Sequence, residues 1–325
     1  MTIKSGHFDE SKIKGNSKLW FHGKLLTGPD YYNAIGSFFA IILPTGIYYG
    51  ICIGWLCTFW SPGGFILLAF AIPLTLTSLI SFFLASTDDP GIIPRNDESP
   101  VEFVNNPGHP RELEAEFNGC KVRIKYCETC KHWRPLRCVH CFKCNNCVER
   151  FDHHCPWLGN CVGRRNYRAF FFFVSVTSIL LIFVIATCIL QLSLNTKRFL
   201  DLNQEMISTA EAFSEALAFW GSGVLIAVIV YAFLAFGFTA GLTGFHLFLM
   251  WKNLSTNEFI KKTYGKKNEM NPFPDRGVNA WRSRLLTSKT QSKVKIGYNG
   301  PKLDDDENMN DLIQRARAQF ESTQV

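Results

Sequence analysis

A short segment of the sequence concentrates cysteine and histidine at spacings that suit metal binding. Between Cys127 and Cys161 the pattern is C-x2-C-x9-H-C-x2-C-x2-C-x6-H-x6-C. The candidate ligands are Cys127, Cys130, His140, Cys141, Cys144, Cys147, His154 and Cys161. They make two sets of three thiolates and one imidazole, and a metal held by four protein ligands is structural because no position remains for water. The sequence therefore predicts two structural Zn²⁺ ions.

Four side chains of the same segment remain once these ligands are assigned: Asp152, His153, Cys155 and Cys138, of which we expect Cys138 to be a passive free thiol. A neighbouring imidazole can take the proton of a thiol and leave the nucleophilic thiolate. A carboxylate that orients this imidazole completes the acid, base and nucleophile of acyl transfer. We expect Cys155 to be the nucleophile, His153 its base and Asp152 the orienting acid. In the alternative, Cys155 is one more ligand and His153 packs, but both ligand sets are already filled.

Four apolar segments flank the cysteine-rich segment and are long enough to cross a bilayer, which takes about 20 residues. They run approximately over Asn33–Trp60, Gly63–Ala85, Ala169–Gln191 and Phe219–Trp251. Pro44 and Pro73 interrupt the first two, which a helical bundle in a membrane tolerates. We predict an all-α polytopic membrane protein, with the zinc-bound segment between the second and third helices.

The basic residues indicate the orientation of these helices. Lys and Arg are frequent before the first helix, in Ser86–Arg168 and after Lys252, whereas Leu192–Ala218 has only Lys197 and Arg198. The positive-inside rule then places both termini and the cysteine-rich segment in the cytosol, where thiols stay reduced. The expected division is 1–32 (cytosolic arm), 33–85 (two helices), 86–168 (cysteine-rich domain), 169–251 (two helices) and 252–325 (cytosolic tail).

The tail and the net charge have simple explanations. The net charge is +7, but the basic residues lie beside the apolar segments, where an anionic membrane surface explains them better than nucleic acid does. We therefore expect no nucleic-acid partner. The acidic stretch Asp304–Glu307 is expected to be a solvated, flexible segment. The weak amphipathic pattern of Asp311–Phe320 fits a short helix and a solvated surface equally well.

The metal-ligand and catalytic motifs between Cys127 and Cys161 resemble the cysteine-rich domain of DHHC protein S-acyltransferases. The resemblance lies in the residues Arg134-Pro135-Leu136-Arg137, His140-Cys141, Asp152-His153-His154-Cys155-Pro156-Trp157 and Asn160-Cys161. Weaker matches flank this core: Asp89-Pro90-Gly91, Ser255-Thr256-Asn257-Glu258 (where the family has TTxE) and Asn271-Pro272-Phe273 followed by Asn279. Bare spacing allows several ways of pairing the ligands. The family's arrangement implies Cys127, Cys130, His140 and Cys147 on one zinc, and Cys141, Cys144, His154 and Cys161 on the other.

The resemblance implies transfer of a palmitoyl or similar long-chain acyl group from acyl-CoA to cysteines of substrate proteins, through a thioester on Cys155. It also implies an acyl cavity between the four helices. Guanidinium groups suit phosphates, so Arg134, Arg137, Arg164 and Arg165 are candidates for the CoA phosphates, with lipid headgroups as the alternative. Trp157 could line the acyl entrance or belong to an interfacial aromatic belt.

The expected partners are membrane lipid, substrate proteins with cysteines near the membrane and, in some relatives, a small accessory subunit. The family suggests the Golgi or the endoplasmic reticulum, and the plasma membrane stays open. Two other classes of protein fit less well. A RING-like ubiquitin ligase or scaffold would end its ligand series with another C-x2-C, which is absent after Cys161. A transporter would carry charged residues inside its helices, and these segments have almost none.

Overall fold

The chain folds into two compact units. The computed structural model describes residues 8–100, 103, 108, 110–203, 206–264, 270–286, 289, 290, 292–295, 311–316 and 318. The first unit comprises Met1–Ala34, Leu84–Arg168 and His246–Val325, and the second Ile35–Phe83 and Ala169–Phe245. The predicted acidic stretch Asp304–Glu307 lies outside the described residues.

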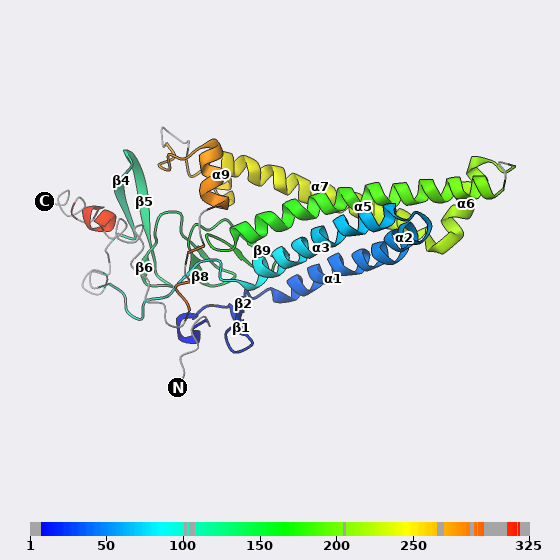
Figure 1. Ribbon diagram of the computed structural model, residues 1–325. Coiled ribbons are helices and arrows are strands. Elements are labelled where there is room, and N and C mark those ends of the chain that lie inside the picture. Colours follow the sequence, from blue (N-terminus) through cyan, green and yellow to red (C-terminus); the bar gives the residue numbers. More distant parts are fainter. Residues whose placement is uncertain are drawn as a thin grey trace. The chain divides into compact units, whose positions relative to one another are not determined.

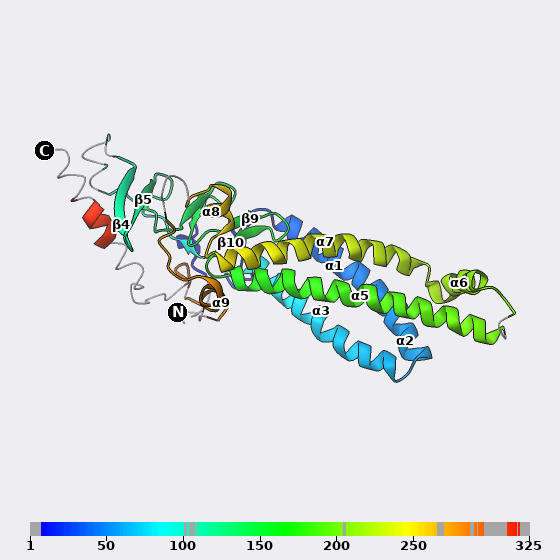
Figure 2. The same cartoon turned by 90° about the horizontal axis from the view of Figure 1, so that it is seen from above.

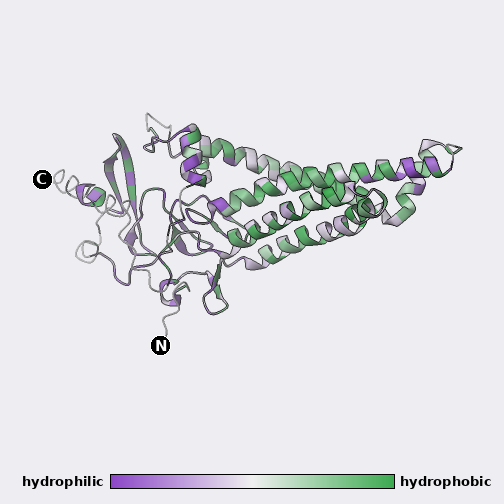
Figure 3. Cartoon of the chain, viewed as in Figure 1, coloured by the Kyte–Doolittle hydropathy of each residue, from purple (hydrophilic) through white to green (hydrophobic). Residues whose placement is uncertain are grey.

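Four long apolar helical segments run alongside one another (Figures 1 and 2). They are α1 (Tyr31–Ile47) continued by a π-helical turn (Tyr48–Ile53) and α2 (Gly54–Phe59), then α3 (Gly63–Thr87), α5 (Tyr167–Leu202) and α7 (Val224–Trp251). All four are long and apolar enough to cross a membrane, and apolar residues cover most of their length (Figure 3). The prediction of four helices long and apolar enough to span a membrane is therefore confirmed, and Pro44 and Pro73 lie inside their helices.

The second unit has an apolar core between these helices. Trp55, Leu56, Ala71, Leu180 and Leu225 are buried in one cluster. Hydroxyl groups inside the bundle bond to each other across helices: Ser78 to Thr177 at 2.7 Å and Tyr48 to Thr187 at 3.0 Å. Pairing of this kind satisfies polar groups where no water is present to do so.

The third span and the following loop differ from the prediction. Helix α5 continues beyond Gln191 to Leu202, and the predicted loop also contains α6 (Thr209–Ala218). Helix α6 begins with a capping box, in which Ser208 accepts from the backbone of Glu211 and the Glu211 side chain accepts from the backbone of Ser208. The fourth span begins at Val224, because Trp220 has a φ of 56° and interrupts the helix before it.

The prediction of an all-α fold is wrong for the first unit, which contains four small antiparallel sheets. Two are hairpins, β1 (Lys18–Trp20) with β2 (Leu25–Thr27), and β9 (His153–Cys155) with β10 (Asn160–Val162). The other two have the orders β3-β8-β7 and β4-β5-β6. Their strands are β3 (Ile92–Ile93), β4 (Glu112–Phe117), β5 (Cys120–Cys127), β6 (His132–Trp133), β7 (Val139–Cys141) and β8 (Asn146–Val148).

One face of the β4-β5-β6 sheet carries a small core of its own. Along β4 and β5 the exposed charged residues alternate with buried apolar ones, as a strand with one buried face requires. Residues 311–316 are helical, and their buried side chains belong to the same cluster as the apolar face of the sheet: Leu113, Ala115, Val122, Ile124, Leu312, Ile313 and Ala316. The amphipathic pattern in this part of the tail therefore forms a helix.

Candidate metal centres and active site

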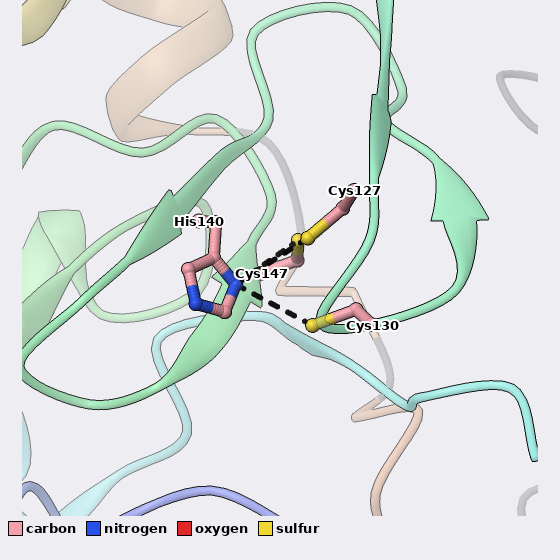
Figure 4. A group of neighbouring side chains, drawn as sticks. All are labelled: Cys127, Cys130, His140 and Cys147. Atoms are coloured by element: carbon pink, nitrogen blue, oxygen red, sulfur yellow. Dashed lines mark hydrogen bonds between the residues drawn. The ribbon is translucent and has the colours of Figure 1, made fainter. Parts of the chain in front are cut away.

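The structure brings Cys127, Cys130, His140 and Cys147 together (Figure 4). The Nδ1 atom of His140 lies 3.5 Å from Cys127 Sγ, 3.5 Å from Cys130 Sγ and 3.7 Å from Cys147 Sγ. His140 and Cys147 are cross-strand partners in the β7-β8 pair, which sets their side chains side by side. Lys131 has a φ of 54° directly after the C-x2-C turn and so reverses the chain there. We call this group the first quartet.

Cys141, Cys144, His154 and Cys161 form a second group of the same composition, the second quartet. His154 Nδ1 lies 3.8, 3.4 and 3.6 Å from the Sγ atoms of Cys141, Cys144 and Cys161. The β9-β10 hairpin pairs His154 with Cys161. This grouping of the eight residues in space is the one that the family resemblance implies.

The donor sets fit zinc. A tetrahedral ion with Zn–S of about 2.3 Å and Zn–N of about 2.0–2.1 Å holds its sulfur and nitrogen ligands roughly 3.6 Å apart. The six Sγ–Nδ1 distances lie between 3.4 and 3.8 Å. Both quartets could therefore accept Zn²⁺ with little movement, each through three thiolates and Nδ1 of one histidine.

Asp152 lies beside the second quartet and is 1% exposed. Its Oδ2 accepts from His153 Nδ1 at 2.9 Å and from the Thr256 hydroxyl at 2.6 Å, and its Oδ1 accepts from the Thr256 backbone N–H at 3.0 Å. Burial alone would raise the pKa of Asp152, but the hydrogen bond from His153 and its charge hold the pKa below the usual value. The residue is therefore set up as an ionised hydrogen-bond acceptor for the imidazole.

His153 connects this carboxylate to Cys155. Burial disfavours a charged imidazole, yet hydrogen bonds with Asp152 and Cys155 outweigh it and raise the pKa of His153 to about 9. Cys155 is 7% exposed and belongs to neither quartet. A protonated imidazole beside a cysteine stabilises the thiolate. The structure thus brings the three predicted catalytic residues into one chain of contacts.

The segment after the last span supports this group. Helix α8 (Thr256–Ile260) begins with a capping box between Ser255 and Glu258. The Glu258 carboxylate accepts from Arg137 Nε at 2.7 Å and Nη2 at 2.6 Å, and both side chains are buried. Ser255 thus caps the helix, Thr256 holds Asp152 and Glu258 pairs with Arg137, which explains the spacing of this motif.

Sequence reasoning missed two residues at the site, Thr256 as a partner of Asp152 and His246 as a neighbour of His153. His246 lies in α7 and is 1% exposed. Its Nδ1 is 3.0 Å from the Tyr167 hydroxyl, and its ring centroid is 6.1 Å from that of His153. Asp152, His153 and His246 each place one polar atom within 4.8 Å of the others.

The predicted phosphate-binding arginines have different environments. Arg137 is buried against Glu258, and Arg165 is buried 3.2 Å from Asp89, whose side chain caps the backbone at Gly91 and Ile92. Arg164 lies 3.8 Å from Glu149. Arg134 lines a cavity of about 980 Å³ that Arg137 also lines. The other charged side chains of its lining are Lys121, Arg123, Lys125, Lys261, Lys262, Glu114 and Glu258. Trp157 is 62% exposed in the β9-β10 turn.

The comparison with known families identifies this geometry. Residues 121–263 match the family of DHHC palmitoyltransferases. This part of the chain is therefore similar to the DHHC palmitoyltransferase domain. The matched residues include both quartets, Cys155 and α8.

Several curated proteins are similar over most of the chain. Probable protein S-acyltransferase 5 of Arabidopsis thaliana is 40% identical over 275 residues, 80% of this chain and 54% of the relative. Protein S-acyltransferase 8 of the same plant is 38% identical over 263 residues, 76% and 62% of the two chains. Palmitoyltransferase ZDHHC18 of Rattus norvegicus is 39% identical over 230 residues, which are 65% of this chain and 56% of the relative. The chain thus spans between 54% and 62% of the length of these three relatives.

Proposed function

We propose that this chain is a protein S-acyltransferase that moves a long-chain acyl group, such as palmitoyl, from acyl-CoA to cysteines of substrate proteins. The observation that carries the proposal is the chain of contacts Asp152–His153–Cys155, with its thiol outside both quartets. The matched family and the names of the similar curated proteins support the same activity.

In the first step His153 takes the proton of the Cys155 thiol. The thiolate attacks the carbonyl carbon of the acyl-CoA thioester, the carbon–sulfur bond to CoA breaks, and the CoA thiolate leaves with a proton from His153. In the second step His153 takes the proton of a substrate cysteine, whose thiolate attacks the acyl-enzyme and frees Cys155. A covalent intermediate of this kind gives ping-pong kinetics.

Asp152 has a supporting role in both steps. Its Oδ2, 2.9 Å from His153 Nδ1, keeps the other ring nitrogen directed away from the carboxylate and available to Cys155. It also stabilises the imidazolium that forms when the thiol loses its proton. Thr256 holds this carboxylate through two hydrogen bonds, so the base has a fixed orientation before substrate arrives.

The two quartets hold structural Zn²⁺ in this proposal. Zinc with four protein ligands supplies folding energy and no reacting group. Because His154 is a ligand and Cys155 is the next residue of β9, the second ion would fix the backbone at the nucleophile. The proposed catalytic chemistry itself involves only side chains of the protein.

Of the four arginines considered for the CoA phosphates, Arg134 has the most suitable surroundings. It shares its cavity with Lys261 and Lys262, and a group of cations favours a polyanion. Arg137 and Arg165 already pair with buried carboxylates, so their contribution would be to hold the site together. Trp157 is exposed, as a contact for the acyl chain or for lipid requires.

The four apolar helices support a membrane location for the enzyme. We propose that both termini and the DHHC domain face the cytosol, with the domain limits given by 86–168, in a Golgi or endoplasmic reticulum membrane. The substrates would be cytosolic or membrane-associated proteins with cysteines near the bilayer. A small accessory subunit, as in some members of the family, could add to this core.

Acyl transfer can be tested by labelling. Purified protein is incubated with a clickable palmitoyl-CoA analogue, and the labelled residue is located by mass spectrometry. We expect a hydroxylamine-sensitive label on Cys155 that is absent from Cys155→Ser and unchanged in Cys120→Ser, because Cys120 belongs to neither quartet. A label that persists in Cys155→Ser at the wild-type rate would contradict the assignment.

A further inference from the structure

The N-terminal arm, defined here as Gly15–Asp30, contacts the second quartet. The Asn16 backbone N–H donates to the Cys144 carbonyl at 2.8 Å, and its side chain donates to the Lys143 carbonyl at 3.0 Å. Asn146 donates to the Ser17 hydroxyl at 3.3 Å. These bonds attach the arm to the segment Lys143–Asn146, which carries Cys144 of the second quartet.

The same arm ends at a histidine of the second quartet. Asp30 Oδ2 lies 3.0 Å from His154 Nε2. The other ring nitrogen, Nδ1, is the one that faces the three sulfur atoms. A carboxylate that binds the distal N–H of a metal-ligating histidine fixes its tautomer and orientation and increases its basicity. Asp30 stands at this position.

Close backbone packing holds Asp30 in place. A Cβ on Gly28 would lie 2.3 Å from the Gly159 carbonyl oxygen, and one on Gly159 would lie 2.6 Å from the Asp30 carbonyl oxygen. Gly159 also has a φ of +62°, which a glycine adopts without strain. Leu26, in the middle of the arm, is fully buried in a cluster with Ile92. The backbone that carries Asp30 is therefore packed directly against the β9-β10 turn.

The first quartet has a different environment. Within the described parts of the chain, no carboxylate forms a hydrogen bond or ion pair with His140. The ring of His140 instead lies beside that of Phe142, with 5.6 Å between the centroids. The two quartets have the same four ligand types. The contact between Asp30 and His154 is therefore a clear difference between them. Any effect of Asp30 should therefore be restricted to one of the two metals.

We propose that Asp30 is a positioning residue of the second metal site. It orients His154, and the arm Gly15–Asp30 holds the site from the N-terminal side. Because Cys155 follows His154 on β9, the same contact fixes the backbone of the nucleophile relative to the start of α1 at Tyr31. The inference rests on the proposed function only in taking the quartets as zinc sites.

The test measures zinc in the full-length protein in detergent, in a Cys155→Ser background so that acyl transfer plays no part. Zinc release to a chelator is followed for the parent, Asp30→Ala and Asp30→Glu. Glu128→Gln is the control, because Glu128 is an exposed carboxylate beside the first quartet that pairs with Arg111. Alkylation of the thiols, located by mass spectrometry, reports which quartet opens.

We expect one of the two zinc ions to dissociate about 10 to 100 times more readily in Asp30→Ala, the range typical of such partners. The newly alkylated thiols should be Cys141, Cys144 and Cys161. Asp30→Glu should release zinc more slowly than Asp30→Ala but faster than the parent. Glu128→Gln should release zinc at the parent rate. Release at the parent rate, or equal loss from both quartets, would overturn the proposal. Unlabelled Cys155 in the wild-type acylation assay would instead count against the proposed function alone.

Discussion

Thr256 donates two hydrogen bonds to Asp152, from its backbone N–H to Oδ1 at 3.0 Å and from its hydroxyl to Oδ2 at 2.6 Å. The residues are 104 positions apart, and the long helices α5 and α7 lie between them in sequence. The Asp152 oxygen that binds the hydroxyl also accepts from His153. The segment that follows α7 thus controls the orientation of the proposed base.

Removal of the Thr256 hydroxyl should slow acyl-enzyme formation. A hydrogen bond to a charged group contributes about 1.5–3 kcal/mol, so Thr256→Val should lower the rate of Cys155 labelling by roughly tenfold or more. Thr256→Ser keeps the hydroxyl and should stay within a few-fold of wild type. The measurement is single-turnover labelling with acyl-CoA, with zinc content as the control for folding. Equal rates for Thr256→Val and wild type would show that this bond does not orient the base.

The buried pair of Arg137 and Glu258 should dominate the stability of this region. Both side chains are 5–6% exposed and share two hydrogen bonds, and removal of one partner of such a pair costs about 3–5 kcal/mol. Thermal unfolding in detergent should therefore show a large loss for Glu258→Ala. Arg137→Lys should also be destabilised, because lysine cannot form the bidentate contact. The double variant should be less destabilised than the sum of the two single ones.

The same pair predicts a dependence of stability on pH. The Arg137 guanidinium lowers the pKa of Glu258 from its usual 4.5, although burial acts in the opposite direction. A carboxylate with a depressed folded-state pKa stabilises the fold fully above pH 4.5, and this stabilisation is lost as the pH falls through the folded value. Below pH 4.5, wild type should therefore lose stability more steeply than Glu258→Gln. Parallel curves for the two proteins would contradict this assignment.

Each quartet should be needed for the fold around it. The binding energy of a structural zinc ion is also folding energy, so Cys141→Ala should reduce the zinc content from two ions per chain and abolish acylation of Cys155. Cys120→Ser should keep both ions. Mass spectrometry of the native protein measures the stoichiometry directly. A Cys141→Ala protein that retains full activity with less zinc would show that the second ion is dispensable.

The metal ligands could be predicted from their spacing in the sequence. Contacts between residues far apart in the sequence could not. The members of a C-x2-C pair lie within one turn of chain, so Cys127 and Cys130 meet whatever the rest of the fold does. Asp30 and His154 are 124 positions apart, and nothing in the sequence near Asp30 indicates a partner. Thr256 lies in a motif that resemblance singled out, but only the structure links it to Asp152.

The secondary structure shows the same limit. Strands of two or three residues, such as β9, are too short to show a period, so the all-α prediction overlooked them. The alternation of exposed and buried residues along Glu112–Phe117 covers a whole strand, yet no strand was predicted there. Helix α5 continues beyond the predicted apolar span, and Arg198 in this extension packs over the rings of Phe59 and Phe219, a contact that hydropathy cannot reveal.

The proposed orientation can be tested with glycosylation acceptors. Glu205→Thr creates the acceptor sequence Asn203-Gln204-Thr in the segment between α5 and α6, which the positive-inside rule places outside the cytosol. This variant should gain a glycan that an endoglycosidase removes. Cys120→Thr creates the same kind of acceptor at Asn118 in the proposed cytosolic domain and should remain unmodified, as should the natural sequence Asn253-Leu254-Ser255. The gel shift of each protein expressed in microsomes measures the outcome. A glycan on Asn118 would place the DHHC domain in the lumen, where oxidising conditions oppose free thiolates, and would contradict acylation of cytosolic proteins.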